Sequence, residues 1–523
     1  MTDKILNNKF LILFFLPFLL GSSTVFSFQP FNLFFINFII LPFFFLIIVY
    51  VKKKSKSVYR KKPYKKNLFT VGLFFGYGFY LSGIYWVANS LTFDENFKFL
   101  IPIYLIVIPF FLGLFTGFTT LIVGQFLNYN LISIFFFSAS FSATDYIRGK
   151  ILTGFPWNLW SYSLSNLNEF IQILNLTGLY AFNLLVITIF TLPVFLFFKK
   201  SKLKKFFVLI TIFVTIFSSY IYGNFVINKN KGLLNSLSNK NRFYTKIVSP
   251  NFELKYNTSI NEIETKMIKL IRYSNPNKEY KTLFVWPEGI FTGYSFEEIY
   301  KFKDLINQNF SNNHLILFGI NTVDQVNGNY FNSLIIINNK FEIIGKYNKT
   351  KLVPFGEFLP YETFFNKFGL KKITQGYGSF SKGRDQGNII ISDLNILPLI
   401  CYEIIFPELV QNSDEKTNLI VNISEDGWFG DSIGPHQHFA KSIFRAVENN
   451  VFLVRSANKG ISVILNNKGQ IVRRLNTGET GSIEMNIPLI KSQFKNKNDL
   501  IFFILLFTYL VIFFSYRNKN NGK

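Results

Sequence analysis

Long apolar runs separated by short polar loops dominate the first half of the chain and return near its end. A transmembrane helix needs about 20 mainly apolar residues. The second run follows the first closely, which favours a membrane helix over a secretory signal peptide for the first. The pattern predicts about eight transmembrane helices. Their expected positions are residues 10–27, 31–51, 68–89, 99–124, 171–198, 206–227 and 500–516, with a weaker eighth run at 131–147.

Lysine and arginine gather in three short segments: 52–66, 199–205 and the tail after 516. Basic loops of this kind stay on the cytoplasmic side of the membrane. Eight spans put all three on one side, but only if 131–147 is itself a span, and they put the loop 90–98 on the other side. Both termini are therefore expected in the cytoplasm.

Residues 228–499 have a different pattern, in which short apolar runs alternate with polar segments rich in Asn, Lys and Gly. We expect one α/β domain here, between a membrane domain (1–227) with seven helices and a last helix with a cytoplasmic tail (500–523). Asn-rich segments at 338–340 and 466–469 have the chemistry of hairpin turns. The strands are expected at 282–286, 315–320, 333–338, 341–347, 395–400, 419–424, 451–457 and 461–465, with helices at 259–273 and 434–448.

Composition supports a membrane protein, because 49% of the residues are hydrophobic and 68 are phenylalanine. The net charge of +25 does not indicate nucleic-acid binding, since the basic residues are mostly lysines that alternate with asparagine and accompany no nucleic-acid motif. The single cysteine, Cys401, rules out an internal disulfide. Its thiol is either a small core side chain or a reactive group.

Three expected strand ends in the outer domain carry candidate chemistry. Glu288 follows one strand in FVWPEG, Lys349 and Lys351 follow another in KYNKTKL, and Cys401 ends a third in LICYEI. Taken singly, each has an ordinary explanation: a solvated acid or helix cap, a solvated lysine, a core thiol. Together they match what a thiol nucleophile requires, namely a base and a cation or donor for the developing oxyanion.

Histidine is the usual base, but the chain has only three histidines, so Glu288 is the alternative, with a pKa that burial would raise. A lysine beside Cys401 would lower the thiol pKa and stabilise the oxyanion. The backbone N–H of Tyr402 would be a second donor to that oxyanion.

The motifs WPEG, YNKTKLVPFGEF, CYEIIFPEL and NISEDGWFGDSIGPHQHF resemble the nitrilase (carbon-nitrogen hydrolase) superfamily. More narrowly, their order and the surrounding spans resemble the apolipoprotein N-acyltransferases of the bacterial inner membrane, over the whole chain. GIYWVANS and RGKILTGFPWN add to this likeness. The resemblance implies an α-β-β-α sandwich domain in the periplasm, tethered to a polytopic helical membrane domain.

The same resemblance implies roles for individual residues. It makes Glu288 the general base, Lys349 the partner of the thiolate and oxyanion, and Cys401 the nucleophile, with Lys351 the weaker lysine candidate. It adds Glu357, Tyr402 and Glu403 as supporting residues. Residues near the substrate are expected to be Trp428, Tyr256 and Trp157. Three positions depart from the family pattern: Tyr256, where tryptophan is common, Asp145, where glutamate is expected, and Lys459, within ANKG.

The implied reaction transfers an acyl chain from a glycerophospholipid, through a Cys401 thioester, to the α-amine of diacylglyceryl-cysteine in an apolipoprotein. No metal or organic cofactor is expected, because His436 and His438 lack further ligands nearby in the sequence. Two alternatives stay open. A membrane-tethered amidase would use the same three residues with water as acceptor, and a non-catalytic scaffold would make Cys401 a core residue.

Overall fold

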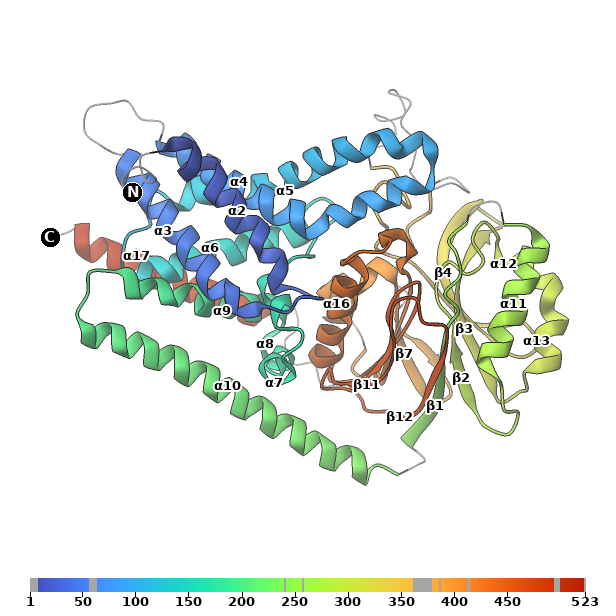
Figure 1. The fold of residues 1–523 in the computed structure, drawn as a ribbon. Helices are drawn as coiled ribbons and strands as arrows, with labels where there is room; N and C mark the ends of the chain where they lie inside the picture. Colours follow the sequence, from blue (N-terminus) through green and yellow to red (C-terminus); the bar gives the residue numbers. More distant parts are fainter. Residues whose placement is uncertain are drawn as a thin grey trace. The chain divides into compact units, whose positions relative to one another are not determined.

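The computed structural model describes residues 8–55, 64–238, 241–255, 258–360, 379–384, 387–411, 414–492 and 499–521, and it divides into two compact units (Figure 1). The first, here called the membrane unit, comprises Met1–Ala88, Glu95–Val226 and Lys495–Lys523. The second, here called the sheet unit, comprises Asn89–Asp94 and Ile227–Phe494. Each is described by itself below.

The membrane unit is helical. Six described segments are long and apolar enough to cross a membrane: Phe34–Lys54, Tyr64–Phe93, Glu95–Val123, Leu179–Phe197, Lys202–Ser236 and Leu500–Asn518. Leu11–Ser27 is a shorter apolar helix, and the count of eight spans stays a prediction. The main helices are α2 (Leu16–Ser23), α3 (Asn37–Ser55), α4 (Tyr64–Ile84), α5 (Ile101–Val123), α6 (Leu131–Lys150), α9 (Leu179–Thr191), α10 (Lys202–Ser236) and α17 (Leu500–Asn521).

The predicted helix over 171–198 is wrong in its first part. Two short helices, α7 (Asn168–Ile171) and α8 (Leu174–Thr177), come before Gly178, and α9 starts only after it. Gly178 has a φ of +74°, a conformation that glycine adopts readily and that a right-handed helix does not contain. This residue therefore ends α8 and lets the chain change direction before α9.

Helix α6 continues beyond the apolar run that predicted it. Asp145 and Arg148 lie one turn apart on its buried face and form an ion pair with an N–O distance of 3.0 Å. The Nδ2 of Asn183, on α9, donates to the second carboxylate oxygen of Asp145 at 2.9 Å. Because each charge has a partner, the helix buries both. Asp145, where the resemblance leads one to expect glutamate, is thus part of a buried ion pair.

The described residues of the sheet unit form two six-stranded sheets. One has the order β12-β1-β2-β3-β4-β5 and the other β11-β10-β9-β8-β7-β6. The eight strands predicted from the sequence are confirmed, and four strands were not predicted: β1, β6, β11 and β12. Their bounds are β1 Arg242–Ser249, β2 Thr282–Val285, β3 His314–Asp324, β4 Asn329–Ile337, β5 Ile343–Asn348, β6 Ile389–Ile391, β7 Leu394–Ile400, β8 Leu419–Glu425, β9 Phe452–Asn458, β10 Ser462–Leu465, β11 Ile471–Leu475 and β12 Gly481–Pro488.

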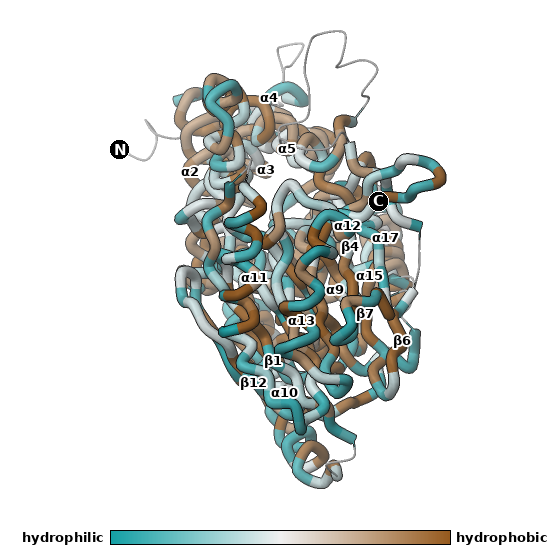
Figure 2. Tube along the Cα trace, turned by 90° about the vertical axis from the view of Figure 1, so that its right-hand side faces the viewer, coloured by the Kyte–Doolittle hydropathy of each residue, from teal (hydrophilic) through white to brown (hydrophobic). Residues whose placement is uncertain are grey.

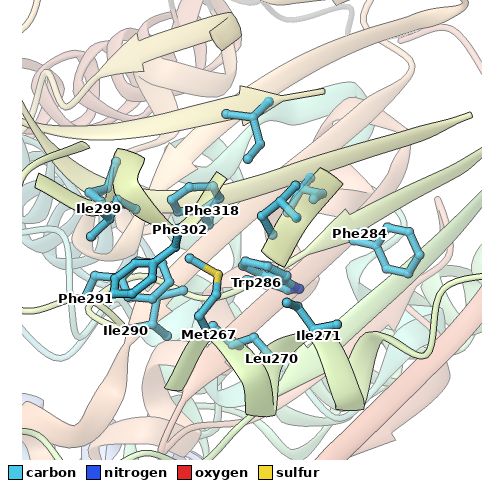
Figure 3. Close-up of a cluster of buried hydrophobic side chains, with 14 of the residues drawn as sticks. Met267, Leu270, Ile271, Phe284, Trp286, Ile290, Phe291, Ile299, Phe302 and Phe318 are labelled. Carbon is cyan, nitrogen blue, oxygen red and sulfur yellow. The ribbon is translucent and has the colours of Figure 1, made fainter. Parts of the chain in front are cut away.

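Alternating side chains divide the first sheet between two cores. On β3, Leu317 joins a core shared with the second sheet, whereas Ile316 and Phe318 join a core under the helices. Figure 3 shows this second cluster around Trp286, Met267 and Phe302. The two faces follow from the period of two along a strand.

Helices cover the outer faces of the two sheets, completing an α-β-β-α sandwich (Figure 1). Helix α11 (Ile260–Ser274) begins at a capping box formed by Ser259 and Glu262 and buries only one face. Its trace changes between hydrophilic and hydrophobic along its turns in Figure 2. Further described helices are α12 (Phe296–Ile299), α13 (Lys303–Asn309), α15 (Pro407–Gln411) and, packed against β9, α16 (Gly434–Asn449).

Candidate active site

Cys401 lies where β7 ends and a short 3-10 helix, η11 (Cys401–Ile405), begins. Its φ is +49°, in the left-handed region that residues with a Cβ rarely adopt. The residue is only 8% exposed. A strained conformation that the surrounding fold maintains is frequent at functional sites. The apolar strand β7 therefore ends at a sharp turn that holds a buried thiol.

Glu288 follows β2 and is held through both carboxylate oxygens. The Nδ2 of Asn332 donates to Oε1 at 2.7 Å, and the backbone N–H of Glu425 donates to Oε2 at 3.1 Å. Gly319 on β3 makes room for the segment, because a Cβ there would lie 2.9 Å from the Glu288 Cα. The carboxylate thus has a fixed orientation before any substrate binds.

Lys349 follows β5 and is 1% exposed. Its Nζ lies 2.9 Å from Glu357 Oε1 and 3.7 Å from Glu288 Oε1. Burial alone would lower the pKa of Lys349, but the carboxylates of Glu357 and Glu288 outweigh it and raise that pKa above its ordinary value. Lys349 therefore stays a cation across the physiological pH range.

Asn332 links the two carboxylates that flank Lys349. Its Nδ2 donates to Glu357 Oε1 at 2.7 Å, as it does to Glu288 Oε1. The second oxygen of Glu357 accepts from the backbone N–H of Val353 at 2.8 Å. Asn332 is not among the residues predicted from the sequence, because an asparagine early in a strand of an asparagine-rich chain carries no distinguishing signal.

The thiol of Cys401 is electrostatically coupled to both charged groups. Burial is the main cause that raises its pKa well above the ordinary value, and the charge of Glu288 adds to this, while Lys349 acts in the opposite direction. The predicted effect of the lysine is correct in direction but smaller than that of burial. The resting group is a neutral thiol, so attack on a carbonyl needs a base to take its proton.

Glu403 joins the segment that carries Lys349 to the strand that carries Cys401. Its Oε1 accepts from the backbone N–H groups of Thr350 and Lys351 at 2.7 and 3.0 Å, and from the hydroxyl of Tyr347 at 2.9 Å. Its Oε2 accepts from the N–H of Ile400 at 2.9 Å. One buried carboxylate therefore ties together the backbones beside both residues.

Replacing Glu403 with glutamine is expected to lower the free energy of unfolding by about 2–4 kcal/mol, because an NH2 group would face N–H donors that now share a carboxylate. Chemical denaturation of the purified protein measures this change. The matched control is Glu408→Gln, which removes a charge that pairs with the partly exposed Lys351 and should change stability by less than about 1 kcal/mol. Equal effects of the two substitutions would contradict the role given to Glu403.

The remaining predicted residues lie in different places. The side chain of Lys351 pairs with Glu408 at 3.1 Å, although its backbone N–H donates to the buried carboxylate of Glu403. Tyr402 packs its ring against Phe406 at a centroid distance of 5.1 Å. Trp428, in the 3-10 helix η12 (Asp426–Phe429), contacts the ring of Phe93 edge to face at 5.2 Å.

Two of the predicted substrate residues, Trp157 and Tyr256, stay predictions. Trp157 belongs to the membrane unit, where it is 2% exposed and packs against Trp86. Tyr256 lies outside the described residues. At the third departure from the family pattern, Lys459 pairs with Glu253. His438 is buried beside Cys401, a placement that the HQH spacing did not predict.

Two family models match separate parts of the chain. Residues 20–192 match the family model of the apolipoprotein N-acyltransferase N-terminal domain, and residues 258–493 match that of the carbon-nitrogen hydrolases. The second match confirms the predicted nitrilase-like fold.

Curated relatives cover most of the chain. An apolipoprotein N-acyltransferase of Rickettsia prowazekii is 32% identical over 508 residues, covering 94% of this chain and 97% of the relative. One of Brucella melitensis is 27% identical, covering 91% of this chain and 90% of the relative. One of Rhizobium leguminosarum is 28% identical, covering 80% of each chain. With both domains matched in order and nearly the whole length shared, this chain belongs to the apolipoprotein N-acyltransferase family.

Proposed function

We propose that this protein N-acylates apolipoproteins in the bacterial inner membrane, with Cys401 as the nucleophile. The observation that carries the proposal is that three strand ends bring together a buried neutral thiol, a carboxylate of fixed orientation and a buried cation. In the sequence, the sheet unit lies between helices that are long and apolar enough to cross a membrane. A small soluble amide would need no such membrane scaffold. A lipid ester as donor and a lipid-anchored amine as acceptor fit it.

In the first half-reaction Cys401 Sγ attacks the carbonyl carbon of a glycerophospholipid ester, at the sn-1 chain, while Glu288 accepts the thiol proton. Lys349 and the backbone N–H of Tyr402 stabilise the oxyanion of the tetrahedral intermediate. The ester C–O bond then breaks, and Glu288 returns the proton to the departing oxygen. The products are a lysophospholipid and a thioester on Cys401.

In the second half-reaction the α-amine of a diacylglyceryl-cysteine attacks the thioester. Glu288 takes a proton from the attacking nitrogen, the C–S bond breaks, and the proton passes to the Cys401 sulfur. The product is an amide-linked third acyl chain on the lipoprotein. A thiolate suits both steps, because it is a good nucleophile and a good leaving group.

The orientation proposed here places the sheet unit, which carries Cys401, in the periplasm and both termini in the cytoplasm. Lysine-rich segments such as 199–205 support it, because they are retained on the cytoplasmic side. Both lipid substrates would then reach the site from the outer leaflet of the inner membrane.

Intact mass spectrometry of the full-length protein after incubation with phosphatidylethanolamine tests the proposal. We expect an added mass of one acyl chain that hydroxylamine removes, as it does thioesters, and that a diacylglyceryl peptide removes faster than water does. An adduct that water releases as fast as the peptide would favour the hydrolase alternative. No adduct on folded, active protein would exclude a phospholipid donor.

A further inference from the structure

His438 lies behind the nucleophile and has no part in the reaction described above. It belongs to α16, is fully buried, and places its Nε2 3.2 Å from the backbone carbonyl oxygen of Cys401. A carbonyl oxygen can only accept a hydrogen bond, so Nε2 carries the proton and donates it. This contact reaches the nucleophile's backbone from an element distant in the sequence.

The other ring nitrogen has two contacts of opposite kind. His438 Nδ1 lies 3.0 Å from Arg455 NH2, which can only donate, and 3.0 Å from Asp426 Oδ1, which can only accept. Asp426 Oδ1 lies 3.0 Å from the same guanidinium nitrogen, so Arg455 serves both acceptors. Burial and the charge of Arg455 lower the pKa of His438 to about 4. The lowered pKa favours a neutral imidazole, and the hydrogen bond to the Cys401 carbonyl then requires its single proton on Nε2, which leaves Nδ1 as the acceptor from Arg455.

Further buried groups hold the histidine and its partners in place. Ser424 donates to Asp426 Oδ1 at 2.7 Å, and Arg455 binds Asp426 through a second contact of 2.8 Å to Oδ2. Asn422 accepts a hydrogen bond from Arg455 and donates one to the Leu399 carbonyl at 3.0 Å. The network connects β8, β9 and α16 to the end of β7, so the position of His438 is set by several elements at once.

Peptide geometry gives this hydrogen bond a consequence on the opposite side of the chain. The carbonyl of Cys401 and the N–H of Tyr402 belong to one planar trans peptide and point in opposite directions. Fixing the carbonyl toward His438 therefore fixes the direction of the Tyr402 N–H. We propose that His438 is a positioning residue that, through the Cys401 carbonyl, aims the Tyr402 N–H at the oxyanion. This inference rests on the proposed function, which makes that N–H an oxyanion donor.

A pair of substitutions separates positioning from general packing. Glutamine places its side-chain NH2 near the position of the imidazole Nε2, whereas asparagine ends near that of Nδ1. We expect His438→Asn to lower the rate of Cys401 acylation by phosphatidylethanolamine by about 10- to 100-fold, the loss typical of a displaced catalytic donor. His438→Gln should recover most of that rate, and KM for the phospholipid should stay unchanged in both variants.

Alkylation of Cys401 by iodoacetamide is the control reaction, because it forms no oxyanion on an attacked carbonyl. Its rate in His438→Asn should stay within about twofold of the original protein while acylation falls, since positioning affects only steps that need the oxyanion donor. Acylation of His438→Asn at the original rate would overturn the inference. So would equal loss of acylation and alkylation in both variants, which would indicate a collapsed site.

Two further outcomes are distinguishable. If Cys401→Ala retained acyl transfer, the proposed role of Cys401 as the nucleophile would fail, whatever His438 does. If both histidine variants failed to fold, a structure of the unsubstituted acyl-enzyme would decide the matter. If His438 positions the Tyr402 N–H, that structure should show the Tyr402 nitrogen about 3 Å from the thioester oxygen, with the hydrogen bond from His438 to the Cys401 carbonyl retained. A thioester oxygen that faces other donors would refute the inference.

Discussion

Replacing Cys401 with alanine is expected to lower N-acylation of a diacylglyceryl peptide by at least about 10⁴-fold, because no other group can form the covalent intermediate. It is the only cysteine in the chain, so the loss cannot be taken over by another thiol. The acyl adduct seen by mass spectrometry should disappear together with the activity. A radiolabelled or fluorescent phospholipid provides the sensitivity that so large a change requires.

The substitution should leave the fold intact, since alanine removes only one sulfur atom from the site. A change in the free energy of unfolding of less than about 1.5 kcal/mol is expected. Cys401→Ser is the matched variant: its hydroxyl keeps the shape of the side chain but is a poorer nucleophile, so it too should be nearly inactive. Activity of Cys401→Ala above a tenth of the original value would refute the thioester mechanism and favour direct transfer between substrates.

Glu288→Gln is expected to lower the acylation rate by about 10³-fold, within the range that general-base removal produces. The amide keeps the volume of the side chain but cannot accept the thiol proton. Because burial keeps the Cys401 thiol protonated, no standing thiolate replaces the missing base. Single-turnover measurement of adduct formation isolates this step, and Glu297→Gln, at an exposed acid on α12, is the control.

The same variant should slow acyl transfer but make the Cys401 thiol easier to deprotonate. The negative charge of Glu288 raises the pKa of Cys401, so its removal should lower that pKa and allow iodoacetamide to react at lower pH. Slower acyl transfer with easier alkylation would be the signature of a lost base. A fall in both rates at every pH would instead mean that glutamine had disordered the site.

Much of the architecture is encoded locally in the sequence. Runs of apolar residues long enough for a bilayer, such as 99–124, become helices because only internally hydrogen-bonded segments are stable in lipid. Alternation along 315–320 identifies a strand, since each side chain must match one of two faces. Motifs around Glu288, Lys349 and Cys401 indicate the chemistry, because strand ends are where a sheet exposes reactive groups.

The tertiary structure alone decided what surrounds those residues. Asn332 bridges two carboxylates, Glu403 joins two chain segments, and His438 reaches the Cys401 backbone from another element. The left-handed conformation of Cys401 also depends on three-dimensional contacts. So does the pKa of its thiol, on which burial has a larger effect than Lys349. Such contacts join residues far apart in the chain, and hydrogen bonds and desolvation depend on distance in space, which the pattern of neighbouring residues does not record.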